Sequence, residues 1–293
     1  MAQRNLALAY ARRQQDYARS VPTMEAALRL ERNPRFLLEM DQLYERAGAP
    51  LAKRLAAFEE NQAVSGQRDD TLAREIAVRV QAGQYDRALE LLRSHTFHVW
   101  EGASITTHGT YVNAHLLRGH ERMKAGRYAE ALEDYRAALA YPENLGEGKS
   151  GSGDRSAVID FYIAAVHTAL GQHSQASEML KRCAAEGGSD RDPEGLYHYA
   201  LALRKLGETE RSSRALNSLM ESGRKLLDGG AVDHFAKFGN SRPLGTSQAQ
   251  AHFSLGLAYL GTGDSARAKL EFQQAIKLDS AHLWARHYLS LCL

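Results

Sequence analysis

Apolar side chains recur at i, i+3, i+4 and i+7 through most of the chain, which is the spacing of one face of an α-helix. The segment 251–276 is the most regular, because small and large residues alternate there along two successive helical stretches. Such alternation is typical of two antiparallel helices whose small positions admit the large side chains of the neighbour. The small residues are Gly256, Ala268 and Ala275, and the large ones are Leu255, Tyr259 and Phe272.

The same arrangement recurs along the sequence, with a glycine between the two helices of most pairs. Glycine suits this position because it readily adopts the left-handed backbone conformation that ends a helix. We expect about seven helix pairs, a C-terminal capping helix at 281–293 and no strand. The predicted pairs span 3–31, 35–62, 69–94, 111–140, 157–186, 193–224 and 248–278.

This helix-turn-helix unit resembles the tetratricopeptide repeat, which has a period of about 34 residues. The resemblance implies an all-α fold, a right-handed solenoid, and we predict that residues 1–293 form a single repeat array. A solenoid buries apolar surface one neighbour at a time, so a chain of 293 residues needs no single large core. A second well-matching copy carries His115, Gly119, Gly126, Tyr128, Ala131, Tyr135, Ala138 and Pro142.

Three intervals between successive inter-helix glycines are longer than the repeat and predict insertions at about 95–109, 142–156 and 225–246. Each insertion follows the second helix of a pair, and loops of one type emerge on one edge of a solenoid. We therefore expect the insertions to share a rim, with the first two as neighbours. The alternative is that this loop simply tolerates length, because loop-closure entropy rises slowly with length.

The first two insertions carry distinctive side chains for loops. A large apolar group such as Trp100 has to pack somewhere, and the adjacent loop or the next repeat is the expected place. The alternative is that Trp100, with its neighbours, forms part of a contact site. The candidate rim residues are Phe97, His98, Trp100, Glu101, Glu143 and Asn144.

The two loop motifs, 97–102 (Phe-His-Val-Trp-Glu-Gly) and 141–146 (Tyr-Pro-Glu-Asn-Leu-Gly), carry a further resemblance. Set between such repeats, they resemble the C-terminal helical region of a family of large bacterial proteins. In that family a β-rich N-terminal domain, suspected to act on carbohydrate, precedes the repeats. The resemblance covers about residues 1–280. It implies that this chain holds the scaffolding part and that any activity of the β-rich domain lies outside it.

The concave groove of such an array is lined by the fifth and ninth positions of the first helix in each pair. Here these positions are mostly apolar or aromatic, without the Lys and Asn of repeats that clamp a terminal carboxylate. This composition favours a hydrophobic contact with a partner, unless the groove packs against the chain itself. The candidate groove residues are Leu38, Leu116, His120, Phe161, Tyr197, Leu201, Phe253 and Leu257.

Composition narrows the class of protein. The chain has 37 Lys+Arg and 35 Asp+Glu, a net charge of +2, which gives no electrostatic reason to expect nucleic acid or an anionic membrane. Two cysteines, Cys183 and Cys292, cannot build a disulfide framework or a four-cysteine metal site. No apolar run approaches a membrane span, and the N-terminus shows no signal-peptide core. We expect a cytoplasmic bacterial protein.

Candidate chemistry is sparse. The segment 146–153 is similar to a phosphate-binding loop, but Glu143 stands where that motif needs glycine, so we predict a flexible loop. His95 and His98 are three residues apart, but no cysteine or H-E-x-x-H pattern accompanies them, so we expect no metal. No nucleophile and base can be paired from spacing. We therefore predict no catalytic residue, no cofactor and no enzymatic activity for this chain.

Two functions stay open from the sequence. The first is a protein–protein interaction scaffold that binds a partner or a linked domain through its groove or rim and contains no buried titratable cluster. The second is a helical accessory region of a carbohydrate-active enzyme, with rim loops contacting the catalytic domain or the sugar. Self-association through the apolar groove or the terminal helix is a further possibility.

Overall fold

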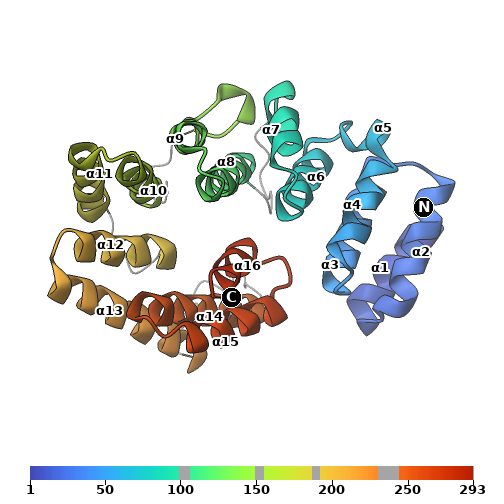
Figure 1. Ribbon diagram of the computed structural model, residues 1–293. Coiled ribbons are helices and arrows are strands. Elements are labelled where there is room, and N and C mark those ends of the chain that lie inside the picture. Colours follow the sequence, from blue (N-terminus) through green and yellow to red (C-terminus); the bar gives the residue numbers. More distant parts are fainter. Residues whose placement is uncertain (99–105, 149–154, 187–191, 230–243, 293) are drawn as a thin grey trace. The chain divides into compact units, whose positions relative to one another are not determined.

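The computed structural model describes residues 1–98, 106–148, 155–186, 192–229 and 244–292, and these contain helices and no strand (Figure 1). The helices alternate as the first and second members of antiparallel pairs. The first helices are α1 (Ala2–Gln14), α3 (Pro34–Arg46), α6 (Asp69–Gln81), α8 (Thr107–Lys124), α10 (Ser156–Ala169), α12 (Pro193–Lys205) and α14 (Leu244–Thr262). The second helices are α2 (Tyr17–Leu30), α4 (Leu51–Glu59), α7 (Tyr85–Ser94), α9 (Tyr128–Ala137), α11 (His173–Glu186), α13 (Thr209–Leu227) and α15 (Ser265–Leu278).

Three short elements complete the chain: α5 (Gln62–Ser65), the 3-10 helix η1 (Glu143–Leu145) and α16 (Leu283–Ser290). The predicted pairs and the C-terminal helix agree with the observed bounds to within a few residues. The insertions are shorter than predicted, because α8 and α14 begin earlier and α13 ends later than the periodicity indicated. The third insertion, at 225–246, lies mostly outside the described residues.

The turn inside each pair depends on one residue in the left-handed region. In six pairs this residue is a glycine with φ between 67° and 89°, which confirms the predicted role of glycine. The first pair has Gln15 there, at φ 50°, the single non-glycine residue with positive φ in the described part of the chain. The six glycines are Gly48, Gly83, Gly126, Gly171, Gly207 and Gly263.

The fourth position of each second helix is buried against the first helix of its pair. Six of the seven pairs place a small residue there, which lets the two backbones approach closely. Where the residue is serine, its hydroxyl also donates to the facing backbone: Ser20 Oγ to Ala7 O at 2.8 Å, and Ser212 Oγ to Ala200 O at 2.7 Å. The seventh pair, α3 with α4, has Arg54 instead. The seven residues are Ser20, Arg54, Ala88, Ala131, Ala176, Ser212 and Ala268.

The chain divides into two compact units. Unit 1 comprises Met1–Ala125 with Ala137–Lys149, and unit 2 comprises Gly126–Arg136 with Ser150–Leu293. Each has its own apolar core, one centred on residues such as Leu37 in unit 1 and one around Cys183 in unit 2. A single array over residues 1–293 stays a prediction.

The left-handed turn yields a test with matched controls. We expect Gly83→Ala to lower the free energy of unfolding by about 1–2 kcal/mol, because its φ of 76° disfavours any side chain although no atom would meet the new Cβ. Gly66→Ala is the control, since Gly66 is equally open but has φ −74°. We expect Gln15→Gly to be neutral or stabilising. Urea unfolding followed by circular dichroism measures all three, and equal losses in both alanine variants would contradict the explanation.

Candidate functional site

The first two insertions meet, as the sequence predicted, and Asn144 joins them. Its Nδ2 donates to Leu92 O and to His95 O, each at 2.7 Å, and its carbonyl accepts from the Phe97 backbone N at 2.7 Å. Phe97 is 4% exposed and packs edge-on against the His95 ring. We call residues 95–98 and 141–148 the rim. The Asn144 amide is therefore used to hold the rim together within unit 1.

Asp69, at the start of α6, fixes the other side of the rim. His95 Nε2 donates to its Oδ1 at 2.8 Å, and the backbone N and Nδ1 of His98 donate to its Oδ2 at 2.8 and 3.0 Å. Burial disfavours the Asp69 carboxylate, but these hydrogen bonds outweigh burial and lower the pKa of Asp69. The result is a histidine pair tied to one carboxylate. Sequence reasoning missed Asp69, because nothing in the spacing relates it to the loop.

Glu147 connects the second loop to the start of α8. Its Oε1 accepts from the Thr107 backbone N at 2.6 Å and from Thr107 Oγ1 at 2.7 Å, which places a negative charge at the positive end of the helix. Thr107 Oγ1 also donates to Leu145 O at 2.8 Å. His108 stacks on Tyr141 with ring centroids 3.8 Å apart. Residues 146–148 of the glycine-rich segment thus belong to a cap and include no phosphate cradle.

The candidate rim residues have different surroundings. The Phe97 side chain is buried, the Asn144 amide is bonded within the rim, and Glu143 is exposed. The His98 side chain is 83% exposed although it is tied to Asp69. Trp100 and Glu101 lie outside the described residues. Contact of the rim with a partner, a catalytic domain or a sugar stays a prediction.

The C-terminal helix α16 is seated on an aromatic surface of unit 2. The Tyr288 ring, 1% exposed, lies with its centroid 5.8 Å from Tyr197 on α12 and 5.9 Å from Phe253 on α14. Its hydroxyl lies 3.5 Å from the hydroxyl of Tyr162 on α10. We call the surface formed by Tyr162, Tyr197, His198 and Phe253 the aromatic face. Helix α16 lies beside α14 and α15 in Figure 1 while its side chains reach the first helices of three pairs.

A buried polar network accompanies this contact. Tyr288 donates to Glu194 Oε1 at 3.0 Å, and Arg155 Nη2 lies 2.6 Å from the same oxygen. The Arg155 guanidinium also covers the Trp284 ring of α16, 4.1 Å from its centroid. Burial raises the pKa of Glu194, against the influence of Arg155, which favours the carboxylate. Helix α16 is therefore held by charge and hydroxyl chemistry as well as by apolar contact.

His198 sits at the centre of the aromatic face in a defined tautomer. Its Nδ1 lies 2.8 Å from the Glu194 carbonyl oxygen and must donate to it, so Nε2 accepts from the Tyr162 hydroxyl at 3.0 Å. The residue is 1% exposed. Burial lowers the pKa of His198 to about 3, and burial together with Arg155 lowers that of His287 on α16 to about 4. The face thus holds neutral imidazoles.

The candidate groove residues are more buried than an open groove requires. Leu116 and Leu257 are fully buried, and Phe253, Tyr197 and Phe161 are 3%, 7% and 9% exposed. Leu38, His120 and Leu201 are half-buried. In unit 2 the self-packing alternative accounts for this burial at Tyr197 and Phe253, because α16 covers them. Partner binding by these side chains stays a prediction.

The expectation of no buried titratable cluster is wrong. Asp41, fully buried on α3, accepts from Arg54 on α4 at 2.7 and 2.8 Å and from Arg74 on α6 at 2.5 Å. Glu45 completes the cluster, 2.7 Å from Arg74 Nη2. The charges balance and every one has an opposite partner, so the cluster joins helices and resembles no catalytic pair. The sequence signal was Arg54 at the small position of its repeat.

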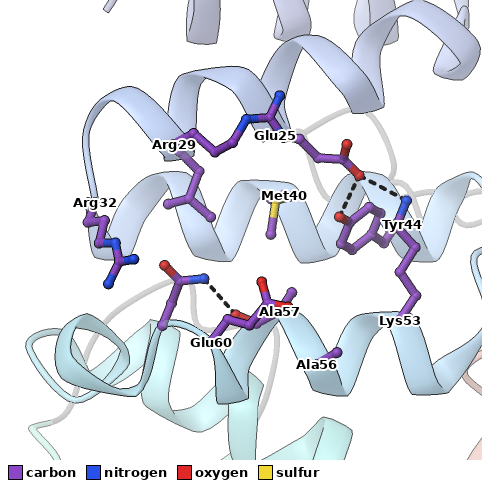
Figure 2. A pocket seen from close by; sticks show the side chains of 11 residues that line it. Glu25, Arg29, Arg32, Met40, Tyr44, Lys53, Ala56, Ala57 and Glu60 are labelled. Atoms are coloured by element: carbon purple, nitrogen blue, oxygen red, sulfur yellow. Dashed lines mark hydrogen bonds and ion pairs between the residues drawn. The ribbon is translucent and has the colours of Figure 1, made fainter.

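A cleft of about 370 Å³ opens among α2, α3 and α4 (Figure 2). Glu25 occupies its wall, 2.8 Å from Lys53 Nζ and accepting from the Tyr44 hydroxyl at 2.7 Å. Burial opposes ionisation of Glu25, but these two contacts outweigh it and lower the pKa of Glu25. The cleft therefore carries a paired carboxylate that links three helices of the first repeats.

No other chemistry gathers in the described residues. In these residues no three His, Cys, Asp or Glu side chains are placed to share a metal ion. Cys183 is fully buried, and burial raises the pKa of its thiol to about 12, which suits the predicted role of a small apolar side chain. None of the helices in the described ranges has the length and apolar character needed to cross a bilayer.

Comparison with known proteins supports the repeat assignment. The sequence model of the tetratricopeptide repeat matches residues 112–144 and 249–282, which contain α8 with α9 and α14 with α15. The prediction of an all-α solenoid of helical repeats is confirmed. The resemblance to proteins with a β-rich N-terminal domain stays a prediction.

Solved structures of tetratricopeptide repeat proteins are similar to this chain at low identity. One is a protein from Parabacteroides merdae ATCC 43184, 16% identical over 99% of this chain and 97% of that chain, with a TM-score of 0.46. Another is YrrB, described as having an unusual peptide-binding site, 17% identical over 79% of this chain and 95% of that chain, with a TM-score of 0.29. A third is the APC/C hetero-tetramer Cut9-Hcn1, 13% identical over 99% of this chain and 52% of that chain, with a TM-score of 0.40.

The rim yields a stability prediction. We expect Asn144→Ala to lower the free energy of unfolding by about 2 kcal/mol, because two carbonyls lose their donor. Asn144→Asp should cost more, since a carboxylate would face the same carbonyls. Glu143→Ala, an exposed neighbour, is the control and should change stability by no more than about 0.5 kcal/mol. Urea unfolding measures this, and a loss in the control equal to that of Asn144→Ala would refute the role of the amide.

The buried His198 predicts acid sensitivity. The unfolded chain binds a proton at His198 below about pH 6.5, whereas the folded chain binds it only near pH 3. Stability is therefore full above pH 6.5 and falls by about 1.4 kcal/mol per pH unit inside this window. We expect His198→Gln to remove this slope and His173→Gln, an exposed control on α11, to keep it. Urea titrations between pH 4 and 7 decide, and a wild-type slope in both variants would contradict the assignment.

Proposed function

We propose that this chain is a non-catalytic protein–protein interaction scaffold whose partner binds along the inner side of the first helices. The observation that carries the proposal is the seating of α16 on the aromatic face. A surface that already buries a helix of this chain has the shape and chemistry to bury a helix or extended segment of another protein. Tetratricopeptide repeats generally serve such contacts, and the two matching segments support the same class of function.

The aromatic face has the composition of a strong binding surface. Aromatic side chains and arginine carry most of the binding energy in protein interfaces, because they bury large areas at a small cost in side-chain entropy. Tyr197 and Phe253 supply the rings, and Arg155 supplies a guanidinium that already stacks on an aromatic side chain. The near-zero net charge agrees with recognition by apolar contact in preference to long-range electrostatic attraction.

The absence of a chemical mechanism among the described residues shapes the proposal. The buried Asp41 cluster is charge-balanced and the rim residues bond to one another, so neither presents an acid, base or nucleophile to a substrate. We therefore assign the rim the role of a rigid border of the binding surface. The carbohydrate-related alternative has no observation of its own in support.

The proposal is tested by affinity capture with quantitative mass spectrometry. Leu38→Glu and Leu201→Glu place a charge at half-buried positions on the inner side of the first helices, and they should reduce retention of the specific partner at least about tenfold. Leu270→Glu on α15, where Leu270 is 61% exposed, is the matched control and should retain the partner. An identical set of retained proteins for wild type and all three variants would remove the support for the scaffold.

A further inference from the structure

Helix α16 displays a compact recognition pattern. Trp284 and Tyr288 are separated by four residues, so they lie one above the other on the same helix face. They are 8% and 1% exposed, and Ala285 between them is fully buried. Arg286 and Ser290 on the other side are exposed. The contact thus uses one face of a two-turn helix.

Each aromatic side chain meets a polar anchor of the aromatic face. Tyr288 donates its hydroxyl to Glu194 at 3.0 Å, and Trp284 lies beneath the guanidinium of Arg155, 4.1 Å from the ring centroid. Arg155 and Glu194 are themselves paired at 2.6 Å, so the two anchors have a fixed spacing. An aromatic ring one turn before a tyrosine matches that spacing. A carboxylate at either place would meet the Glu194 charge or forfeit the stacking.

We propose that the aromatic face is a receptor for a partner helix carrying an aromatic residue at position i and tyrosine at i+4, and that α16 is its tethered occupant. The partner is a segment of another protein with this pattern, and it binds by displacing α16. This inference rests on the proposed scaffold function and names the chemistry of the partner. Helix-in-groove recognition of this kind depends on side chains at i and i+4.

The structure of α16 suits an occupant that can be replaced. It has eight residues, far fewer than the roughly 12–15 that make an isolated helix even marginally stable in water, so it is helical because it is seated. It is connected to α15 by a short turn in which the His282 backbone N donates to Asp279 O at 3.1 Å. The tether gives α16 an effective concentration in the millimolar range. A longer partner helix of the same pattern gains additional contacts and so competes with it.

The test uses a fluorescein-labelled peptide of residues 280–291 as the probe and the full-length chain as the receptor. Trp284→Ala combined with Tyr288→Ala vacates the face, and this variant should bind the peptide at least about tenfold more tightly than the wild type does. Leu291→Ala is the matched control, because Leu291 is 58% exposed just after α16, and it should exclude the peptide as the wild type does. A peptide with Tyr288→Phe should bind the vacated variant about tenfold more weakly, since Glu194 loses a donor.

Two outcomes of the binding assay would overturn the inference. One is no binding by the vacated variant when its circular dichroism and melting curve show the remaining repeats intact. The other is equal binding of the Tyr288→Ala peptide. A concentration-dependent dimer of the wild-type chain in light scattering, lost in Tyr288→Ala, would instead assign the face to a second copy.

Hydrogen exchange keeps the inference testable if the vacated variant does not fold. In the wild type, amides of α16 should exchange at least about tenfold faster than those of α14, and an excess of peptide should speed them further as α16 is displaced. No change on adding peptide would overturn the inference. If the peptide fails while Leu38→Glu and Leu201→Glu still lose the partner, only the helix pattern is wrong. If those variants lose nothing, the scaffold function itself is wrong.

Discussion

The close approach of two antiparallel helices is the constraint on which every repeat depends. A helix pair can bury its apolar stripe only if the chain reverses within two or three residues and the backbones then meet without a bulky side chain between them. The left-handed residue meets the first condition and the small fourth residue of the second helix meets the other. Gln15 in the first pair shows that the backbone conformation matters more than the residue type.

Arg54 shows what happens when the second condition is relaxed. A long side chain at the small position of α4 is buried only because Asp41 on α3 neutralises it, and Arg74 on α6 then shares the same carboxylate. Burying a charge without a partner would cost several kcal/mol, so the three residues stand or fall together. Unit 1 therefore joins neighbouring repeats with balanced ion pairs, whereas unit 2 joins them with stacked rings around Glu194.

The most informative surface is one that the chain covers itself. Because α16 is too short to be helical on its own, its order and the burial of the aromatic face depend on each other. The same contact brings neutral histidines, a buried carboxylate and a stacked guanidinium into one place. These groups stabilise a particular helix pattern, and this specificity is what connects the fold to partner recognition.

The sequence by itself determined the repeat. The period, the glycine turns, the helix bounds and the meeting of the first two insertions all follow from spacing, because local backbone preference and apolar periodicity are local properties. It could not reveal that Asn144 and Asp69 hold the rim, that Arg54 pairs with Asp41, or that α16 reaches Glu194, since these partners lie far apart in the chain. Only tertiary structure decides which buried polar groups meet, because their pairing depends on how successive repeats are stacked.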